Sequence, residues 1–175
     1  MTRSQLEHIL RAAAAITGTD EFVIIGSQAI LGSVAQPPPE LVVSIEADLF
    51  TRHSAQDADL IDGSIGEAPP FHRAFGYYAH GVGVETAILP DGWEERLVPF
   101  QSANTGGAKG LCLDIHDLTV AKLAAGRPKD LDFVAALFRH RLATVEQTLS
   151  RLDCAPLDDQ QRRLCVSRVR RLSIG

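Results

Sequence analysis

The stretch FVIIGSQAILGS, residues 22–33, passes from a continuous apolar run into a Gly-Ser pair and then into a pattern typical of a short helix. Ten residues further on, VSIEADLF, residues 43–50, is a second apolar run and carries two acids, Glu46 and Asp48. Successive side chains of a strand point to opposite faces, so residues two apart share a face. The sequence therefore predicts two core strands, the second with both carboxylates on one side.

Two carboxylates about 7 Å apart along a strand repel each other unless a cation lies between them. A hard divalent ion such as Mg²⁺, or Mn²⁺ in its place, takes oxygen ligands and commonly combines one or two protein carboxylates with phosphate oxygens. Glu46 and Asp48 are therefore candidate metal ligands at a nucleotide site. An edge strand with a solvated polar face explains the same two residues, and the motif alone leaves both explanations open.

Gly26 and Ser27 lie where the first strand turns into the helix. A glycine at such a turn lets the backbone approach a ligand closely. A serine at or near a helix N-terminus places N–H groups and a hydroxyl where phosphate binds well. The pair is a candidate phosphate-binding turn of a kind different from the P-loop, because the chain lacks G-x-x-x-x-G-K-[ST].

Composition indicates a globular chain with a real core. It has 175 residues, of which 45% are hydrophobic and 22% charged, and a formal charge of −5. The negative charge argues against broad electrostatic binding to nucleic acid but leaves room for a local basic patch. Five arginines within residues 162–171 form either such an anion- or RNA-binding surface or a solvated helix face.

Several classes of protein are disfavoured. Three cysteines, with no C-x-x-C spacing, argue against a disulfide framework or a zinc site and favour reduced thiols in the cytoplasm. Residues 1–16 are expected to form an amphipathic helix rather than a signal peptide, and no apolar run approaches the roughly 18–20 residues of a membrane span. No G-x-S-x-G motif supports a serine hydrolase.

The periodicity predicts an α/β (α+β) fold. A first helix over residues 4–18 is expected to be capped by Ser4 and Glu7 and to end at Gly18. The segment 71–83, with two histidines among aromatics and glycines, is expected to be a loop or helix end that either packs in the core or stacks a nucleobase. Expected strands are residues 21–26, 41–50, 84–89, 95–101 and 110–114, with helices over 27–35 and 54–67.

After Asp114 the pattern becomes helical. The expected helices are 115–126, capped by Asp114 or His116 and ended by Gly126, then 127–141 with Pro128 at its first position, 142–152 and 156–172. This layout predicts two parts: an α/β core over residues 1–115 and a helical segment over residues 116–175 packed on that core.

A basic and acidic cluster follows the first of these helices. Lys122 lies on a mostly apolar helix face, so it must extend its amine to water or meet an anion. Pairing with Asp130 and contact with a phosphate both satisfy it. Arg127, Lys129 and Asp130 lie within one turn of the next helix start, where the helix dipole stabilises the acid.

The two opening motifs resemble the signature of the nucleotidyltransferase, or polymerase-beta-like, superfamily: an apolar residue, Gly, then Gly or Ser, a helix, and acid-x-acid on a strand. DLTVAKLAAGRPKDLDFV, residues 117–134, resembles a segment of the branch around the AbiEii and MenT toxins, in which a Lys-bearing helix precedes an Arg/Lys-Asp pair. Over about residues 20–140 the chain resembles the bacterial family DUF6036, described as nucleotidyltransferase-like.

The resemblance implies a minimal nucleotidyltransferase fold, with a small mixed sheet flanked by helices and a C-terminal helical segment. It implies transfer of a nucleoside monophosphate from a Mg-NTP to an RNA such as tRNA, a protein or a small molecule. By position, it implies these roles: Gly26, Ser27, Lys122, Arg127, Lys129 and Asp130 bind the nucleotide, Glu46 and Asp48 bind the metal, and Glu46, Asp48, Glu85 and Lys122 act in catalysis.

The chain departs from the superfamily pattern in two ways. Its first acid, Glu46, stands where most active relatives have Asp, and the insert SVAQPPPE, residues 33–40, lengthens the interval before the acids. Glu85, on the strand expected at 84–89, is the best candidate for the third carboxylate that relatives carry. The alternative function is a catalytically degenerate module that binds a nucleotide or a partner protein encoded nearby, as half of a toxin–antitoxin or defence pair.

Overall fold

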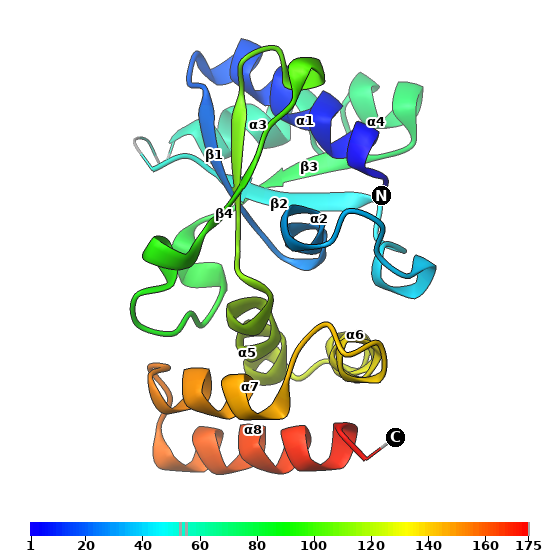
Figure 1. The fold of residues 1–175 in the computed structure, drawn as a ribbon. Helices are drawn as coiled ribbons and strands as arrows, with labels where there is room; N and C mark the ends of the chain where they lie inside the picture. The colour runs from blue at the N-terminus through cyan, green and yellow to red at the C-terminus, as the bar shows by residue number, and fades with distance from the viewer. Residues whose placement is uncertain (53, 55, 175) are drawn as a thin grey trace. The chain divides into compact units, whose positions relative to one another are not determined.

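The computed structural model describes residues 1–52, 54 and 56–174. These residues form a five-stranded mixed sheet of order β3-β2-β1-β5-β4. Its strands are β1 Glu21–Ile25, β2 Glu46–Phe50, β3 Tyr78–Gly81, β4 Val98–Phe100 and β5 Lys109–Cys112. β1 runs antiparallel to β2 and parallel to β5, β3 runs parallel to β2, and β4 runs antiparallel to β5 (Figure 1). The predicted small mixed sheet is confirmed.

Helices flank the sheet and make up the C-terminal part of the chain. Eight α-helices occur in the described ranges: α1 Arg3–Thr17, α2 Ile30–Ser33, α3 Gln56–Ile65, α4 Pro70–Phe75, α5 Ile115–Ala125, α6 Pro128–Arg139, α7 Val145–Asp153 and α8 Asp159–Leu172. The last four confirm the predicted helical segment. The helix expected over 54–67 is α3; Ala55, at its expected start, lies outside the described residues.

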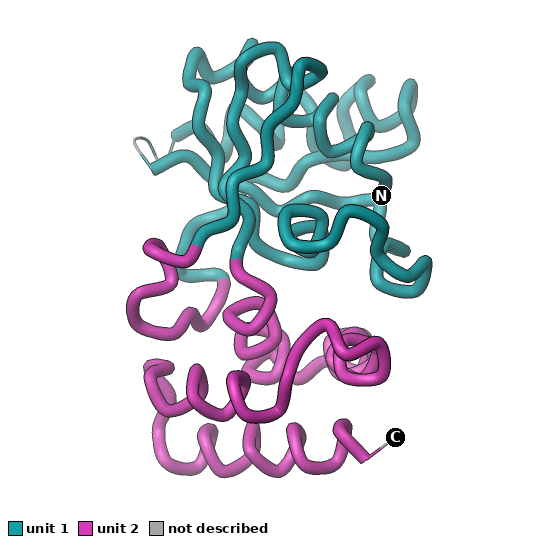
Figure 2. The backbone as a smooth tube through the Cα atoms, in the orientation of Figure 1, with its two compact units in different colours: residues 1–86, 97–113 teal, residues 87–96, 114–175 magenta. Residues whose placement is uncertain are grey.

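The chain divides into two compact units (Figure 2). Unit 1 contains Met1–Thr86 and Leu97–Leu113, and holds the sheet with α1 to α4. Unit 2 contains Ala87–Arg96 and Asp114–Gly175, and holds α5 to α8. Each unit has its own buried core.

The core of unit 1 is built on β1, whose residues Phe22, Val23 and Ile24 are fully buried, as the continuous apolar run predicts. α1 and α3 pack against each other and against the sheet (Figure 1). Gly110 of β5 leaves the space that α1 needs, because a Cβ there would lie 2.6 Å from Ile24 and 3.1 Å from Leu10.

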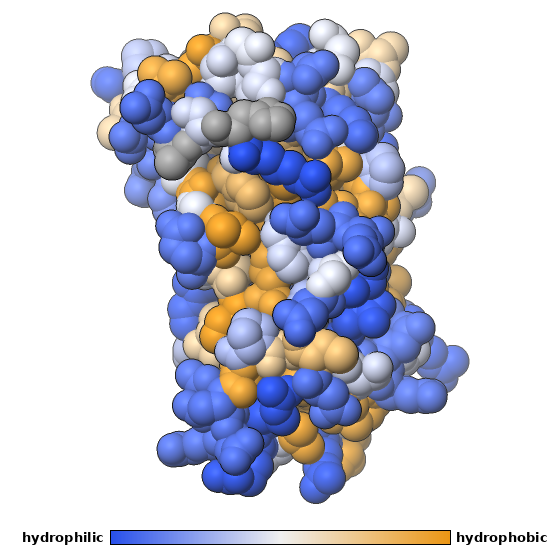
Figure 3. Space-filling view, turned by 90° about the vertical axis from the view of Figure 1, so that its left-hand side faces the viewer, coloured by the Kyte–Doolittle hydropathy of each residue, from blue (hydrophilic) through white to orange (hydrophobic). Residues whose placement is uncertain are grey.

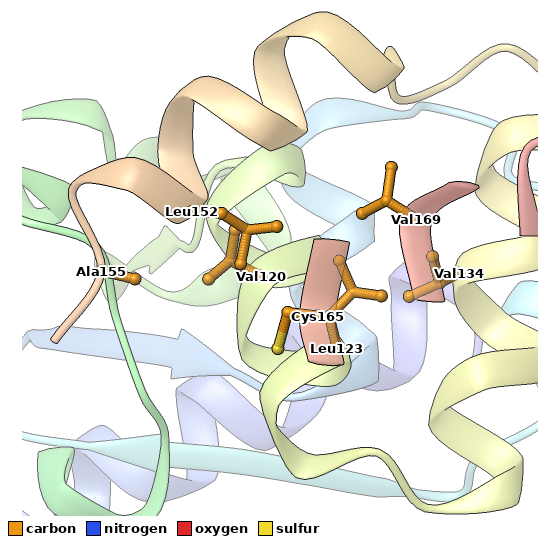
Figure 4. Packing of buried hydrophobic residues seen from close by; sticks show 7 residues of the cluster. All are labelled: Val120, Leu123, Val134, Leu152, Ala155, Cys165 and Val169. Atoms are coloured by element: carbon orange, nitrogen blue, oxygen red, sulfur yellow. The ribbon is translucent and has the colours of Figure 1, made fainter. Parts of the chain in front are cut away.

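The core of unit 2 is a cluster of apolar side chains from all four of its helices (Figure 4). Val120 and Leu123 come from α5, Val134 from α6 and Leu152 from α7, and all four are fully buried. Cys165 of α8 joins the cluster as a free thiol, and burial raises its pKa. The core therefore depends on every helix after the sheet.

The first helix is capped by Thr2, two residues before the predicted Ser4. Thr2 accepts a hydrogen bond from the N–H of Gln5 at 3.3 Å, and the Gln5 side chain accepts from the N–H of Thr2 at 2.7 Å. The predicted Ser4 and Glu7 cap is wrong, because the T-x-x-Q pattern two residues upstream satisfies the helix end. Glu7 is instead buried and accepts hydrogen bonds from two residues of the loop before β5, Ser102 and Asn104. The predicted end at Gly18 is confirmed.

Two expected strands differ from the structure. The strand expected over 41–50 begins only at Glu46, because the carbonyls of Val42 and Ser44 accept hydrogen bonds from the amino group of Met1 instead of joining a ladder. The strand expected over 84–89 is wrong. Residues Val84–Thr86 form a 3₁₀ turn closed by Thr86 on the carbonyl of Gly83, and the third strand is the preceding segment, β3.

The surface drawn in Figure 3 is mainly hydrophilic, with hydrophobic residues interspersed. The large hydrophobic side chains exposed among the described residues are Val43, Ile45, Leu60, Phe75, Val84, Leu164 and Ile174. Scattered exposure of this kind is ordinary for a folded domain. Among the helices of the described residues, none has the length and apolar character needed to cross a membrane.

Candidate metal centre

Strand register gathers the predicted acids with two residues of β3. Glu46 pairs with Tyr78 and Asp48 pairs with His80 in the parallel β2–β3 ladder. Alternation along the strands places these four side chains on one face of the sheet, while Ala47 is fully buried on the other. The predicted common face of the two acids is confirmed.

His80 lies between the two carboxylates. Its Nδ1 is 3.0 Å from Oε1 of Glu46 and 3.5 Å from Oδ1 of Asp48. One donor atom from each of the three residues lies within 4.8 Å of the other two, and in the described part of the chain this is the one group of three metal-ligating side chains so arranged. First-row metal bonds of about 2.0–2.2 Å require donor atoms at such separations. The donor set therefore fits a divalent cation.

The Gly-Ser turn lies directly beside this group. Ile25 pairs with Asp48 across the β1–β2 ladder, and Gly26 follows with a φ of +65°. A Cβ on Gly26 would lie 1.9 Å from Oδ2 of Asp48, so a side chain at this position would force the Asp48 carboxylate to move. Ser27 starts a 3₁₀ turn, Ser27–Ala29, and is half-buried. The structure thus brings the predicted turn and the predicted acids together.

Gln28 fixes the start of β2 from the same turn. It is fully buried, and its Nε2 donates to the carbonyl of Ser44 at 3.0 Å. The hydroxyl of Ser44 in turn accepts from the backbone N–H of Glu46 at 3.2 Å. This chain of contacts links the turn after β1 to the first acid of β2, and so sets where Glu46 stands relative to Gly26.

A pocket of about 210 Å³ opens beside Glu46 and His80, two of the three residues of this group. It is lined by Glu46, Asp62, Glu67, Tyr78, Ala79 and His80. Asp62 of α3 accepts from the backbone N–H of Gly81 at 2.8 Å, which ties the pocket wall to β3. Burial raises the pKa of Tyr78, and the negative charges of Glu46, Glu67 and Asp48 and a hydrogen bond with Glu46 raise it further. The phenol is therefore a neutral group beside the acids.

The aromatic segment 71–83 divides between core and pocket. Tyr77 is buried, and its hydroxyl lies 2.7 Å from Nδ1 of His8, with the rings of Phe71 and Phe75 around them. Tyr77 therefore bears out the core-packing alternative, whereas Phe71 is half-buried and Phe75 is exposed. Tyr78, the next residue, instead lines the pocket, and its ring centroid is 4.8 Å from that of His72.

The third member of the group is one that sequence reasoning missed. His80 belongs to Tyr78-Ala79-His80, a polar–small–polar alternation that signals a half-buried strand, but this segment was expected to be a loop or helix end. Glu85, the expected third acid, is exposed on the turn after β3, and its carboxylate lies over Gly83. The group of three in the structure does not include it.

The second predicted segment lies in unit 2. Nζ of Lys122 is 3.0 Å from Oδ1 of Asp130, and Nε of Arg127 is 2.5 Å from its Oδ2. Lys122 and Asp130 are buried, while Arg127 and Lys129 are exposed. Burial opposes ionisation of Asp130, but the hydrogen bonds and charges of Arg127 and Lys122 hold its pKa below the usual value. The pairing alternative for Lys122 is thus present in the structure.

Asp114 caps α5, one of the two predicted caps, by accepting from the N–H groups of His116 and Asp117. Asp117 itself is fully buried between Arg96, which it binds through both carboxylate oxygens at 2.8 and 3.0 Å, and Arg151 at 3.2 Å. These contacts fasten residues 87–96 to α5 and α7 within unit 2.

A comparison with protein families matches residues 4–142 to the model of DUF6036, described as "Nucleotidyltransferase of unknown function". The match covers more than half of the chain and both predicted segments. Comparisons with curated proteins and with solved structures find no significant match.

Proposed function

The chain belongs to the DUF6036 family of nucleotidyltransferases of unknown function, and we propose that it transfers a nucleoside monophosphate from a nucleoside triphosphate to an acceptor hydroxyl. The hydroxyl oxygen would bond to the α-phosphorus and lose its proton, and the bond to the β-phosphate would break to release pyrophosphate. The observation that carries the proposal is that Glu46 and Asp48 share one face of the sheet and that the Gly26 turn lies beside Asp48. Because Gly26 brings the backbone of this turn next to the Asp48 carboxylate, a phosphate held by a metal ion on Asp48 would also lie near the turn.

Glu46 and Asp48 would hold the divalent ion, Mg²⁺ or Mn²⁺, that nucleotidyl transfer uses. When bound, such an ion neutralises phosphate oxygens and stabilises the charge that develops during transfer. The two carboxylates are about 30% exposed, so they are open to a ligand yet fixed by the strand that carries them. Their task is to hold and orient the triphosphate, which is most of what an enzyme contributes to phosphoryl transfer.

Gly26 and Ser27 would lie along the triphosphate. Gly26 allows close approach because it presents no side chain next to Asp48, and Ser27 adds a half-buried hydroxyl. Lys122 and Asp130, both buried in unit 2, hold the start of α6 against α5. The nucleotide-binding role of Lys122, Arg127, Lys129 and Asp130 stays a prediction.

For the acceptor we propose RNA, because α8 carries a local excess of positive charge. Residues 160–174 contain five arginines and no acid. Arg162 and Arg168 donate to backbone carbonyls of unit 2, whereas Arg163, Arg170 and Arg171 are exposed. Exposed arginines suit phosphate oxygens of a nucleic acid, and a protein or small-molecule acceptor offers no comparable row of anions.

The test is transfer of label from each α-³²P-labelled NTP, with Mg²⁺ or Mn²⁺, to total RNA, total protein or a small-molecule fraction. We expect labelled RNA from the wild type and at least a hundredfold less from Asp48→Asn. Asp59→Asn, which removes an exposed acid of α3, is the matched control and should keep wild-type activity. Label in protein or small molecules instead of RNA would overturn the acceptor. Binding of NTP without any transfer would support the alternative, a nucleotide-binding module.

A further inference from the structure

We infer that His80 is the third metal ligand of this site, standing where a third carboxylate would otherwise be, and that it biases the site toward a first-row transition-metal ion over Mg²⁺. The inference deepens the proposed function and rests on it for the use of a metal. It begins from the distances of 3.0 and 3.5 Å between Nδ1 of His80 and the carboxylates of Glu46 and Asp48.

The backbone holds His80 in position to act as a ligand. Asp48 and His80 are direct partners in the β2–β3 ladder, so their side chains leave the sheet side by side. β3 is the edge strand of the sheet, and the His80 side chain is 49% exposed. An imidazole in this place can turn its ring nitrogen toward an ion between the two acids without displacing any buried group.

The chemistry of the donor set decides which ion is preferred. Mg²⁺ favours oxygen ligands, whereas imidazole nitrogen suits the later first-row metals, with affinity rising from Mn²⁺ through Co²⁺. Two carboxylates and one imidazole also place a charge of −2 around the ion, where three carboxylates would place −3. The nitrogen donor therefore favours binding of the transition-metal ions. The lower ligand charge weakens binding of Mg²⁺ more than that of the transition-metal ions, because Mg²⁺ gains no compensating bond to nitrogen.

A second role for His80 makes the opposite prediction. A protonated imidazole between the acids would act as a cation that neutralises them, in place of a metal ion. Such a group competes with the metal, so its removal would leave metal affinity unchanged or increased. A ligand, by contrast, loses affinity when it is removed. Truncation of His80 therefore separates the two roles directly.

The experiment measures binding of Mn²⁺, Co²⁺ and Mg²⁺ to the full chain without nucleotide, by calorimetry and by the electron paramagnetic resonance signal of free Mn²⁺. We expect the wild type to bind Co²⁺ most tightly and Mg²⁺ most weakly. His80→Ala should weaken Mn²⁺ and Co²⁺ binding at least about tenfold, because loss of an outer-shell partner alone typically costs about 10–100-fold. His80→Asp should bind Mg²⁺ better than the wild type does, and should lower the preference for Co²⁺ over Mg²⁺ at least tenfold.

His140→Ala, a histidine on the exposed end of α6, is the matched control and should bind all three ions as the wild type does. Circular dichroism of each variant checks the fold; should His80→Ala fail to fold, the preference of His80→Asp decides alone. Unchanged or tighter Mn²⁺ binding by His80→Ala, or equal preferences in the wild type and His80→Asp, would overturn the inference.

The transfer assay keeps this result distinct from the proposed function. Metal binding that depends on His80, without any labelled product, would uphold the ligand and reject the transferase. Nucleotidyl transfer that is equally fast with Mg²⁺ in the wild type and in His80→Ala would support the transferase and reject His80 as a metal ligand.

Discussion

Gly26 is the residue on which the geometry of the site depends. Its backbone φ of +65° is one that residues with a side chain rarely adopt. The carboxylate of Asp48 already occupies the place that a Cβ on Gly26 would take. Glycine is therefore required at this position for two reasons, the positive φ and the contact with Asp48. Substitution of a second glycine that has a positive φ but no such contact separates the two effects.

We predict that Gly26→Ala lowers the free energy of unfolding by more than about 2 kcal/mol and abolishes metal binding. The alanine would strain the backbone, and its Cβ would push the Asp48 carboxylate out of place. Gly18→Ala is the matched control: its φ is +72°, but nothing lies within 4 Å of a Cβ there. It should lose only about 1 kcal/mol and bind metal normally. Chemical denaturation and metal calorimetry measure both effects. Equal losses in the two variants would show that the contact with Asp48 has no importance.

Among single residues, the sequence predicts the shared face of the two acids well and the position of His80 poorly. Glu46 and Asp48 share a face because of a period within one strand, which a sequence displays. His80 joins them through the register of a second strand more than thirty residues away, which no local pattern contains. The glycines on either side of 78–80 also favoured a loop there.

Among the elements, α5 and α6 are linked by the buried ion pair of Lys122 and Asp130, and its contribution to stability can be tested by substitution. Lys122→Met should lower the free energy of unfolding by about 1.5–3 kcal/mol, because the buried Asp130 loses its amine partner and keeps only its pair with Arg127. The double variant Lys122→Met with Asp130→Leu should recover most of that loss. Lys109→Met, which breaks the half-exposed pair with Glu21, is the control and should lose less than about 1 kcal/mol. A Lys122→Met variant as stable as the wild type would contradict a structural role for the pair.

The same pair predicts a pH dependence. The pKa of Asp130 is lowered in the folded chain, so its ionised form adds stability that is present above the ordinary value of 3.8 and is lost as the pH falls through the folded pKa. The stability difference between the wild type and Asp130→Asn should therefore be largest near neutral pH and shrink below pH 3.8. Urea denaturation at a series of pH values measures it, and a difference that stays constant down to pH 2 would contradict the assignment.

The ends of helices and strands differ from the sequence prediction where residues distant in sequence form hydrogen bonds with them. Residues 41–45 have the composition of a strand, yet the amino group of Met1 and the side chain of Gln28 take the carbonyls that a ladder would use. The helices of unit 2 agree closely with the prediction, because the end of α5 at Gly126 and the start of α6 at Pro128 are local signals.

On the scale of the whole molecule, charge is divided unequally between the units. Unit 1 has five Lys and Arg against eleven Asp and Glu, and unit 2 has twelve against eleven. Much of the positive charge of unit 2 lies on α8, past its last acid, Asp159. The overall charge of −5 therefore hides a basic helix, and composition alone underestimates the case for an anionic partner.

We predict that RNA binds with a salt dependence that α8 sets. Changing Arg163, Arg170 and Arg171 together to Gln should reduce the slope of log affinity against log salt by about 2, as expected for three lost contacts to single-stranded phosphates. The control removes three arginines of unit 1, Arg11, Arg52 and Arg73, and should leave the slope unchanged. Fluorescence anisotropy with a labelled oligonucleotide measures it. An equal change in both triple variants would indicate net charge alone, without a surface on α8.

The central claim, that Glu46 and Asp48 hold a metal ion for a nucleoside triphosphate beside Gly26, is tested most directly by calorimetry of each NTP with Mn²⁺. We predict saturable, metal-dependent binding of at least one NTP to the wild type and to the control Asp59→Ala, and none to Asp48→Ala. Absence of binding to the wild type, or equal binding to Asp48→Ala, would contradict the claim.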